Sequence, residues 1–290
     1  IVEPVVDRVI TSFDMAGISL TLFWLNDELE TYWKAAADTP AFKRGAISCF
    51  RPETDAALIP QVAVASQSVT VGSPASQRIA AIILEIFASA KQIIETQQEE
   101  LGRLDAVAGD GDHGIGMLRG VSAALDAAKK AHNAQAGAGT LLTLSGEAWA
   151  ARAGGTSGAL WGVILNTLGG KLGDTTVPDT AAVAGSVAAV LCEVMRCGKA
   201  QPGDKTLVDV LQPFSTALDQ ASARGISVVT AWQDAADIAN TAAQQTRNLL
   251  PRIGRARPHA EKSIGTPDPG AISLAMIITA VSEVIRKHCP

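Results

Sequence analysis

From Gln77 onward, apolar residues recur with the 3.6-residue period of α-helices, in alanine-rich segments separated by short breaks that contain glycine or proline. Ser76 is expected to open the first helix, and Asp268 to introduce the last. Short connections between helices, without strand patterns, predict an all-α bundle or barrel of about eight antiparallel helices. The predicted helices span residues 77–103, 114–132, 139–152, 157–172, 178–197, 206–223, 227–249 and 269–287.

The first part of the chain has a different pattern. Residues 18–25 form a short apolar run rich in strand formers, and residues 26–37 are typical of a short helix capped by Asn26. These segments predict a short α/β remnant at the N-terminus. Residues 38–76 carry prolines and scattered polar residues without a sustained period, which indicates a linker. Because the chain does not begin with Met, we expect it to be part of a longer protein.

Composition narrows the possible functions. Hydrophobic residues make up 47% of the chain and charged residues 18%, and the net charge is −5, so the basic surface of a nucleic-acid-binding protein is not expected. No apolar run reaches the roughly 18 residues of a membrane span, and we expect neither a signal peptide nor a membrane partner. The four cysteines lack metal-type spacing, which favours reduced thiols and a cytoplasmic location.

The most informative stretch is an acidic loop between the first two predicted helices. Asp105, Asp110 and Asp112 lie within eight residues of one another and are interleaved with Gly109, Gly111, Gly114 and Gly116. Carboxylates that close together repel one another, so a cation is expected to offset their charge. Hard oxygen ligands of this kind suit Mg²⁺, and the glycines free backbone N–H groups to face phosphate oxygens.

Other interpretations of this loop are weaker. Residues 109–114 formally match the G-x-G-x-x-G dinucleotide motif, but a helix rather than a strand precedes them. An EF-hand would place Gly114 and Val121 at positions that require ligands. A solvated acidic turn stays open as an alternative. His113 is either a proton shuttle or a hydrogen-bond donor to a phosphate or an aspartate, and we favour the second role.

Three further breaks could supply groups that face phosphate. Gly154, Gly155, Thr156 and Ser157 come directly before a predicted helix, where free N–H groups and hydroxyls can bind an anion. Residues 196–210 form a glycine-containing break with Lys199 and Lys205. Residues 252–271 hold the densest basic cluster, which consists of Arg252, Arg255, Arg257 and Lys262. An ordinary loop or a solvated face stays open for each of these segments.

Together these segments resemble a known family. In order and spacing, GDGDHG (109–114), GGTSGALWG (154–162), GKAQPGDKTLVDV (198–210) and GRARPHAEKSIGTPDPGA (254–271) resemble the nucleotide-binding L domain of dihydroxyacetone kinases, an all-α barrel of eight helices. The resemblance implies that Asp105, Asp110 and Asp112 hold two Mg²⁺ ions bridging the phosphates of ATP or ADP. Gly116 departs from the family, where many relatives have a polar Asn or Thr. The implied nucleotide contacts are His113, Gly114, Ile115, Gly116, Thr156, Ser157, Gly198, Leu207, Arg255, Asp268, Pro269 and Gly270.

Residues 10–42 resemble the end of the substrate-binding K domain of the same kinases. The implied organisation is a K-domain tail at 1–42, a linker at 43–76 and the L domain at 77–290. The expected function is an ATP-dependent phosphoryl donor for a short-chain ketose, of the dihydroxyacetone or erythrulose type, which a K domain outside this chain would present. A homodimer is possible. The alternatives are a phosphotransferase-system L subunit that keeps ADP as a cofactor, and a nucleotide-binding module without catalysis.

Overall fold

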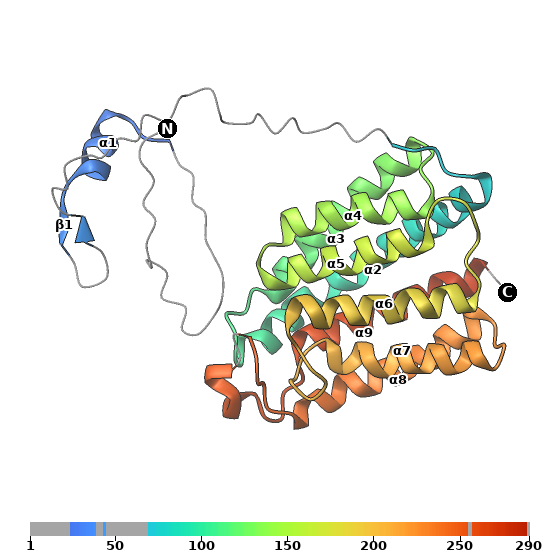
Figure 1. Cartoon of the computed structure of the whole chain (residues 1–290). Coiled ribbons are helices and arrows are strands. Elements are labelled where there is room, and N and C mark those ends of the chain that lie inside the picture. Colours follow the sequence, from blue (N-terminus) through green and yellow to red (C-terminus); the bar gives the residue numbers. More distant parts are fainter. Residues whose placement is uncertain (1–23, 39–42, 45–68, 255–256, 289–290) are drawn as a thin grey trace. The chain divides into compact units, whose positions relative to one another are not determined.

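The computed structural model describes residues 24–38, 43–44, 69–254 and 257–288, and the chain divides into two compact units, Ile1–Ser66 and Gln67–Pro290 (Figure 1). In the first unit, helix α1 (Asp27–Lys34) is capped by Asn26, whose Oδ1 accepts a hydrogen bond from Leu29 N at 2.8 Å. Strands β1 (Ala37–Asp38) and β2 (Lys43–Arg44) pair antiparallel. The helix predicted at residues 26–37 is confirmed, whereas residues 18–23 of the predicted apolar run lie outside the described residues. Strand β2 lies in the segment that was predicted to be a linker.

The second unit contains the eight predicted helices. Each helix has an alanine-rich apolar stripe, and each ends at a glycine-containing or polar break, as the periodicity predicts. They are α2 (Pro74–Ala106), α3 (His113–Asn133), α4 (Ala138–Ala153), α5 (Gly155–Leu172), α6 (Thr180–Gly198), α7 (Val208–Ala223), α8 (Val228–Gln245) and α9 (Pro269–His288). Short 3-10 helices η1 (Thr246–Asn248) and η2 (Arg257–Ser263) lie between α8 and α9.

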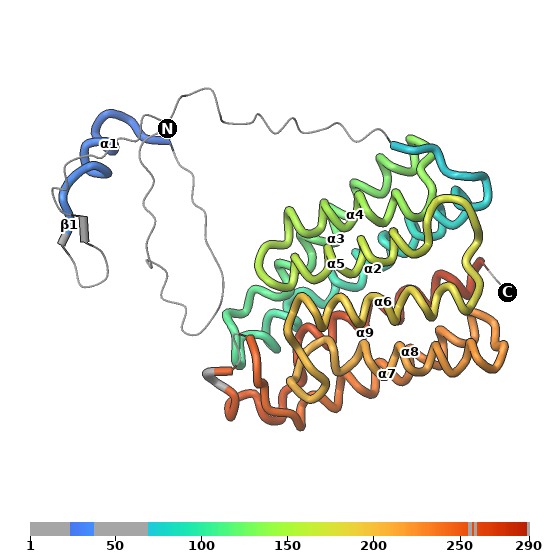
Figure 2. Tube along the Cα trace, viewed as in Figure 1, coloured from blue at the N-terminus to red at the C-terminus, as the bar shows by residue number. Residues whose placement is uncertain are grey.

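These helices form a closed ring. Each packs against the next in the chain, and α9 closes the ring by packing against α2. Neighbouring helices run in opposite directions, as the tube in Figure 2 shows. The α9 end meets the first part of α2, where His288 Nε2 lies 3.1 Å from the Glu85 carboxylate. The α2–α3, α4–α5, α6–α7 and α8–α9 connections therefore share one end of the ring, on the left of Figure 1. We call it the site end.

The observed helices lie within four residues of their predicted bounds, and the start of α2 and the end of α8 are two of the larger differences. Helix α2 begins at Pro74, and Ser73 caps it by accepting a hydrogen bond from Ser76 N at 3.1 Å. The prediction that Ser76 opens this helix is therefore wrong. Ser76 is buried, and its hydroxyl accepts from Ala138 N at 2.9 Å, which fixes the start of α4. Helix α8 ends at Gln245, before the predicted 249, because the chain tightens into η1.

Small residues bring α4 and α5 into close contact. A Cβ added to Gly162 would lie 2.9 Å from Ala150 Cβ, and one added to Gly169 would lie 2.6 Å from the Gly139 carbonyl oxygen. Toward the site end, the buried rings of Trp149 and Trp161 stack with centroids 4.6 Å apart. Such contacts explain why a chain with 4% aromatic residues still forms a dense core.

Helices α6 and α9 also meet the length and hydropathy of a membrane span, with 28% and 50% of their apolar windows buried. Composition alone identifies them, and buried helices of a bundle have the same composition. Both pack between two neighbours in the ring, α6 against α5 and α7, and α9 against α8 and α2. Ring packing buries half of the apolar window of α9 and a smaller part of that of α6.

Adjacent glycines of α5 allow the packing of α4 on α5 to be tested. Gly169→Ala would place a methyl group against the Gly139 carbonyl oxygen and Thr143, whereas Gly170 has no atom within 4 Å of an added Cβ. We expect Gly169→Ala to lower the free energy of unfolding by about 1–3 kcal/mol. Gly170→Ala should raise it by about 0.5–1 kcal/mol, because alanine favours the helix. Urea denaturation of both variants measures these changes, and equal effects would contradict the packing described.

Candidate functional site

The α2–α3 connection gathers three carboxylates at the site end. Among the residues that the structure describes, Asp105, Asp110 and Asp112 are the group that could hold a metal, with one oxygen from each within 4.8 Å of the others. Asp105 is half-buried at the end of α2, and the other two are exposed. The predicted clustering of these side chains is therefore confirmed, and their use as metal ligands stays a prediction.

The backbone of this loop is shaped by glycines. Gly109 N donates to the Asp105 carbonyl oxygen at 2.6 Å, and a Cβ on Gly109 would collide with the Asp105 carboxylate. Gly111 has a φ of +79°, in the left-handed region that glycine favours. His113 N donates to Asp105 Oδ2 at 3.3 Å. The loop thus holds Asp105 beside the start of α3.

The residue types present fit Mg²⁺. All three side chains offer hard oxygen atoms, and two of them are exposed, which leaves room for water or phosphate oxygens around an ion. Two unit negative charges about 4 Å apart repel each other by roughly 1–4 kcal/mol across the range from water to a protein surface. A divalent cation would offset this repulsion.

His113 joins α3 to α9. Its Nε2 lies 2.9 Å from Ser273 Oγ, and Ser273 Oγ in turn donates to the Gly270 carbonyl oxygen at 3.1 Å. Which of the two groups donates follows the tautomer of the imidazole. Burial lowers the pKa of His113, opposed by the charge of Asp105 and by a hydrogen bond to the Pro269 backbone. The ring thus links two helix starts, and its predicted hydrogen bond to a phosphate or an aspartate stays a prediction.

The α4–α5 connection is open. Gly154 and Gly155 have φ values of +71° and +61°, and neither has an atom within 4 Å of an added Cβ. Thr156 and Ser157 are exposed in the first turn of α5. Gly116 lies against the end of α4, because its added Cβ would be 3.4 Å from the Ala153 carbonyl oxygen. The starts of α3 and α5 are therefore neighbours at the site end.

The α6–α7 and α8–α9 connections complete the site end. Gly198 ends α6 beside Leu160 of α5, with 3.5 Å between its added Cβ and a Leu160 methyl carbon. Leu207, largely buried, precedes α7, and its Cβ would be 4.0 Å from a Cβ on Gly270. The predicted residue Arg255 lies outside the described residues. The other predicted site residues all lie in the four connections or the helix ends beside them.

Asp268 caps the start of α9. Its Oδ2 accepts from Ala271 N at 2.7 Å, and its own N–H donates to the buried Thr246 hydroxyl at 2.9 Å. Burial raises the pKa of Asp268 to about 7. The hydrogen bond from Ala271 opposes this shift, the charges of Asp209 and Asp105 add to it, and the charge of Lys205 opposes it. A proton can therefore be gained or lost near the carboxylate cluster around neutral pH.

The sequence did not predict the buried polar contacts of Lys205, Thr246 and Ser273 at the site end. Lys205 is 5% exposed and donates to the Leu249 carbonyl oxygen and to Ser263, and burial lowers its pKa while the charge of Asp268 raises it. The Thr246 hydroxyl accepts a hydrogen bond from Asp268 N at the start of α9, and Ser273 in the first turns of α9 contacts His113. A lysine between Asp204 and Thr206 in a polar loop was the one available signal, and it does not identify partners so distant in sequence.

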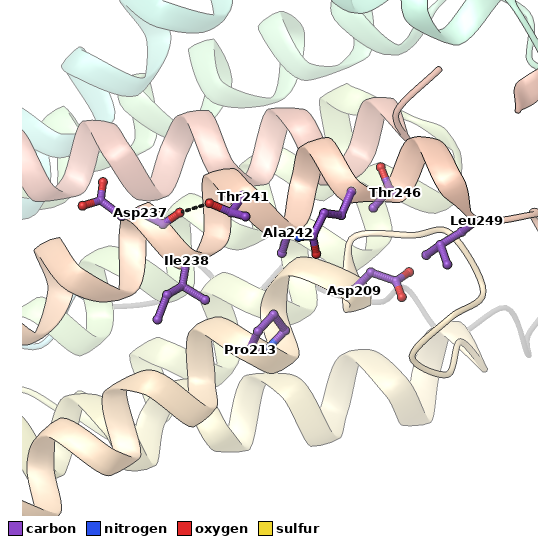
Figure 3. Close-up of a pocket in the computed structure, with 9 residues that line it drawn as sticks. Asp209, Pro213, Asp237, Ile238, Thr241, Ala242, Thr246 and Leu249 are labelled. Carbon is purple, nitrogen blue, oxygen red and sulfur yellow. Dashed lines mark hydrogen bonds between the residues drawn. The ribbon is translucent and has the colours of Figure 1, made fainter. Parts of the chain in front are cut away.

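A groove of about 470 Å³ runs between α7 and α8, outside the site (Figure 3). Near the site end, the Asp209 carboxylate accepts hydrogen bonds from the N–H groups of Gly203 and Thr206. The predicted site residues that the structure describes are not part of its lining. The lining residues are Asp209, Pro213, Asp237, Ile238, Thr241, Ala242, Gln245, Thr246 and Leu249.

The fold and the site define an all-α domain with an acidic cluster beside the starts of three helices. Residues 107–283 match the DAK2 domain, and the chain belongs to this family. It is 53% identical to L-erythrulose kinase of Pectobacterium atrosepticum over 99% of this chain and 48% of that protein. It is 46% identical to D-erythrulose kinase of Mycolicibacterium smegmatis over 98% of this chain and 50% of that protein. The chain spans about half the length of these relatives.

Two further comparisons concern dihydroxyacetone kinases. The chain is 35% identical to the ADP-binding subunit DhaL of the PEP-dependent dihydroxyacetone kinase of Escherichia coli, over 67% of this chain and 92% of that protein. The dihydroxyacetone kinase of C. freundii with AMP-PNP and Mg²⁺ superimposes with a TM-score of 0.52 at 25% identity, covering 89% of this chain and 42% of that chain. The predicted resemblance to dihydroxyacetone kinases and the predicted fold are confirmed.

The raised pKa of Asp268 predicts a pH-dependent stability. Below about pH 7 the native carboxyl keeps its proton, whereas in the unfolded chain it ionises near its ordinary pKa of 3.8. The contribution of Asp268 to the free energy of unfolding is therefore complete at low pH and is lost as pH rises toward and through 7. Asp268→Asn removes this dependence, so its stability relative to the unchanged chain should increase between about pH 4 and 7.

Urea denaturation without divalent cations measures this difference across the pH series. Asp179→Asn is the matched control, because Asp179 caps the exposed start of α6 through the same type of hydrogen bond, to Ala182 N. A stability difference between Asp268→Asn and the unchanged chain that stays constant with pH would contradict the raised pKa.

Proposed function

We propose that this chain is the nucleotide-binding, phosphoryl-donating part of a kinase that acts on a short-chain ketose. The observation that supports this most is the meeting of Asp105, Asp110 and Asp112 with the starts of α3, α5 and α9 at one end of the ring. A nucleotide with a divalent cation carries positive charge for the carboxylates and negative charge for the helix starts. The similarity to erythrulose kinases and to DhaL supports the same function.

Asp105, Asp110 and Asp112 would hold Mg²⁺, and we expect two ions. Bound Mg²⁺ would supply positive charge against the β- and γ-phosphates and against the charge that develops during transfer. Through the bound ions, the carboxylates would set the position of the phosphate chain at the site end. Glycine at position 109 leaves room for the Asp105 carboxylate, with which a Cβ there would collide.

The helix starts would bind the phosphates. The first N–H groups of a helix have no carbonyl partner within the helix and carry partial positive charge, so they attract anions. In α3 the N–H groups of Gly114 and Ile115 would do so, because that of Gly116 donates to the Asp112 carbonyl oxygen and that of His113 to Asp105 Oδ2. In α9 the N–H group of Gly270 would do so, because Pro269 has none and that of Asp268 donates to Thr246 Oγ1. Thr156 and Ser157 would add hydroxyl donors from α5. Gly198 and Leu207 would face the nucleoside, and Arg255 would add positive charge.

The ketose would be bound by a K domain, with the hydroxyl to be phosphorylated directed at the site end. We assign residues 1–42 to the end of that domain, 43–76 to a linker and 77–290 to the L domain. The matches to erythrulose kinases extend over residues 1–66 as well, since they cover 98–99% of this chain. Erythrulose and dihydroxyacetone are both suitable acceptors, and a homodimer formed through K domains is consistent with this organisation.

One alternative is a subunit that keeps ADP bound and receives phosphate from a phosphoprotein, for which the similarity to the ADP-binding subunit DhaL is the supporting observation. That similarity covers 67% of this chain, whereas the erythrulose kinases cover nearly all of it, which favours ATP as the donor. Nucleotide that exchanges freely on dialysis supports ATP as substrate, and nucleotide that is retained supports the alternative. Binding without phosphoryl transfer to a supplied K domain would support a non-catalytic module.

Asp110→Asn tests the acidic cluster. We expect it to raise the dissociation constant of ATP at least tenfold in the presence of Mg²⁺, a loss of about 1.4 kcal/mol, because one of three ligand charges is removed. Calorimetric titration with and without Mg²⁺ measures the binding.

The matched control is Asp126→Asn, an exposed aspartate on α3 that pairs with Lys129 at 3.7 Å. It changes the net charge equally and should leave nucleotide binding unchanged. If Asp110→Asn binds ATP with Mg²⁺ as tightly as this control does, the assignment of the loop is wrong.

A further inference from the structure

Lys205 is a buried charge that the proposed site does not use. It lies between α6 and α7, is 5% exposed, and has a φ of +61°, a left-handed conformation that side chains other than glycine rarely adopt. Burying an ammonium group is costly unless it is fully hydrogen-bonded. A lysine kept in such a place therefore needs a specific structural reason.

All three N–H bonds of the ammonium are directed at protein oxygens. Lys205 Nζ donates to the Leu249 carbonyl oxygen at 3.2 Å, to the Ser263 carbonyl oxygen at 2.6 Å and to Ser263 Oγ at 3.1 Å. The serine hydroxyl donates its own proton to the Ala260 carbonyl oxygen at 2.8 Å, so it accepts from the lysine. Since an ammonium has three donors, none remains for a phosphate. Lys205 is therefore not a nucleotide ligand in this arrangement.

Its partners lie at both ends of the α8–α9 connection. Leu249 follows η1 at the end of α8, and Ser263 ends η2 before α9. The α6–α7 connection makes a second contact with the α8–α9 connection, in which the Asp204 carbonyl oxygen accepts a hydrogen bond from Arg252 N at 3.3 Å. The ammonium also lies near enough to Asp268 for their charges to interact. One side chain in the α6–α7 connection thus joins two distant points of the chain that leads into α9.

We propose that Lys205 is a positioning residue, which holds the α8–α9 connection against the α6–α7 connection and so sets the start of α9 in the place where it binds nucleotide. The effect on the ligand rests on the proposed function, whereas the fastening of the connection does not. Lys205 acts through Leu249 and Ser263 and leaves the carboxylates of the α2–α3 loop untouched. Loss of Lys205 should therefore weaken nucleotide binding and preserve cation binding.

The test compares Lys205→Met with Lys262→Met, which removes an exposed lysine of η2 from the same connection. Hydrogen exchange without nucleotide reports on the fastening. In Lys205→Met we expect faster exchange at the N–H groups of Arg252, Gly265 and Asp268, whose hydrogen bonds tie this connection down, with α4 and α5 unchanged. Lys262→Met should exchange like the unchanged chain.

Binding supplies the readout that a general loss of stability would not give. For Lys205→Met we expect the dissociation constant of ATP with Mg²⁺ to rise about tenfold or more, because the start of α9 is no longer preorganised. Mn²⁺ binding without nucleotide, followed by electron paramagnetic resonance, should stay unchanged because the acidic cluster is intact. Ser263→Ala removes only one of the three acceptors and should show a smaller effect in the same direction.

Each result decides between separate conclusions. If Lys205→Met leaves exchange at Arg252, Gly265 and Asp268 unchanged, the fastening role is wrong. If exchange rises but ATP binding stays equal to that of Lys262→Met, the positioning role is wrong and the proposed function stands. If Lys205→Met does not fold, Ser263→Ala decides by the same two measurements. If the unchanged chain binds no ATP, the proposed function fails, and the exchange data still test the fastening.

Discussion

The site depends on the closure of the helix ring by α9 against α2. Because neighbouring helices alternate in direction, every second connection emerges at the same end, and closure brings the last of these connections beside the first. Asp105 at the end of α2 and Asp268 at the start of α9 thereby come close enough for their charges to interact. At this junction, His113 of α3 contacts Ser273 of α9. Without closure, the carboxylates and the start of α9 would belong to opposite ends of an open row of helices.

The site end combines opposite electrostatic features. Three carboxylates repel one another on one connection, while the starts of α3, α5 and α9 present partial positive charge on the same side of the ring. A cation alone would satisfy the first feature, and an anion alone the second. A metal–nucleotide complex satisfies both at once, which explains why the acidic loop lies beside helix starts. Asp268, with its pKa raised by burial, adds little negative charge below neutral pH.

The sequence predicted the parts of this structure that depend on local pattern. Periodicity located the helices, and their short connections implied an all-α bundle or barrel. The glycine-spaced aspartates predicted the cluster, although the loop that forms it turns at Gly111, whose φ is +79°, and is not extended as expected. Contacts between distant residues were not predictable in this way. The contact of His113 with Ser273 joins segments far apart in the sequence, and nothing local to Lys205 identifies Leu249 and Ser263. Ser73 and Ser76 are equally good caps by type, and only burial of the second distinguishes them.

The central claim is that the acidic cluster and the helix starts bind a metal–nucleotide complex together. A crystal structure of this chain with Mn²⁺ and AMP-PNP, with the anomalous signal of manganese, tests it most directly. We expect manganese within coordination distance of Asp105, Asp110 and Asp112, and the phosphates against the first turns of α3 and α9. Manganese at another place, or phosphates bound away from these helix starts, would contradict the account.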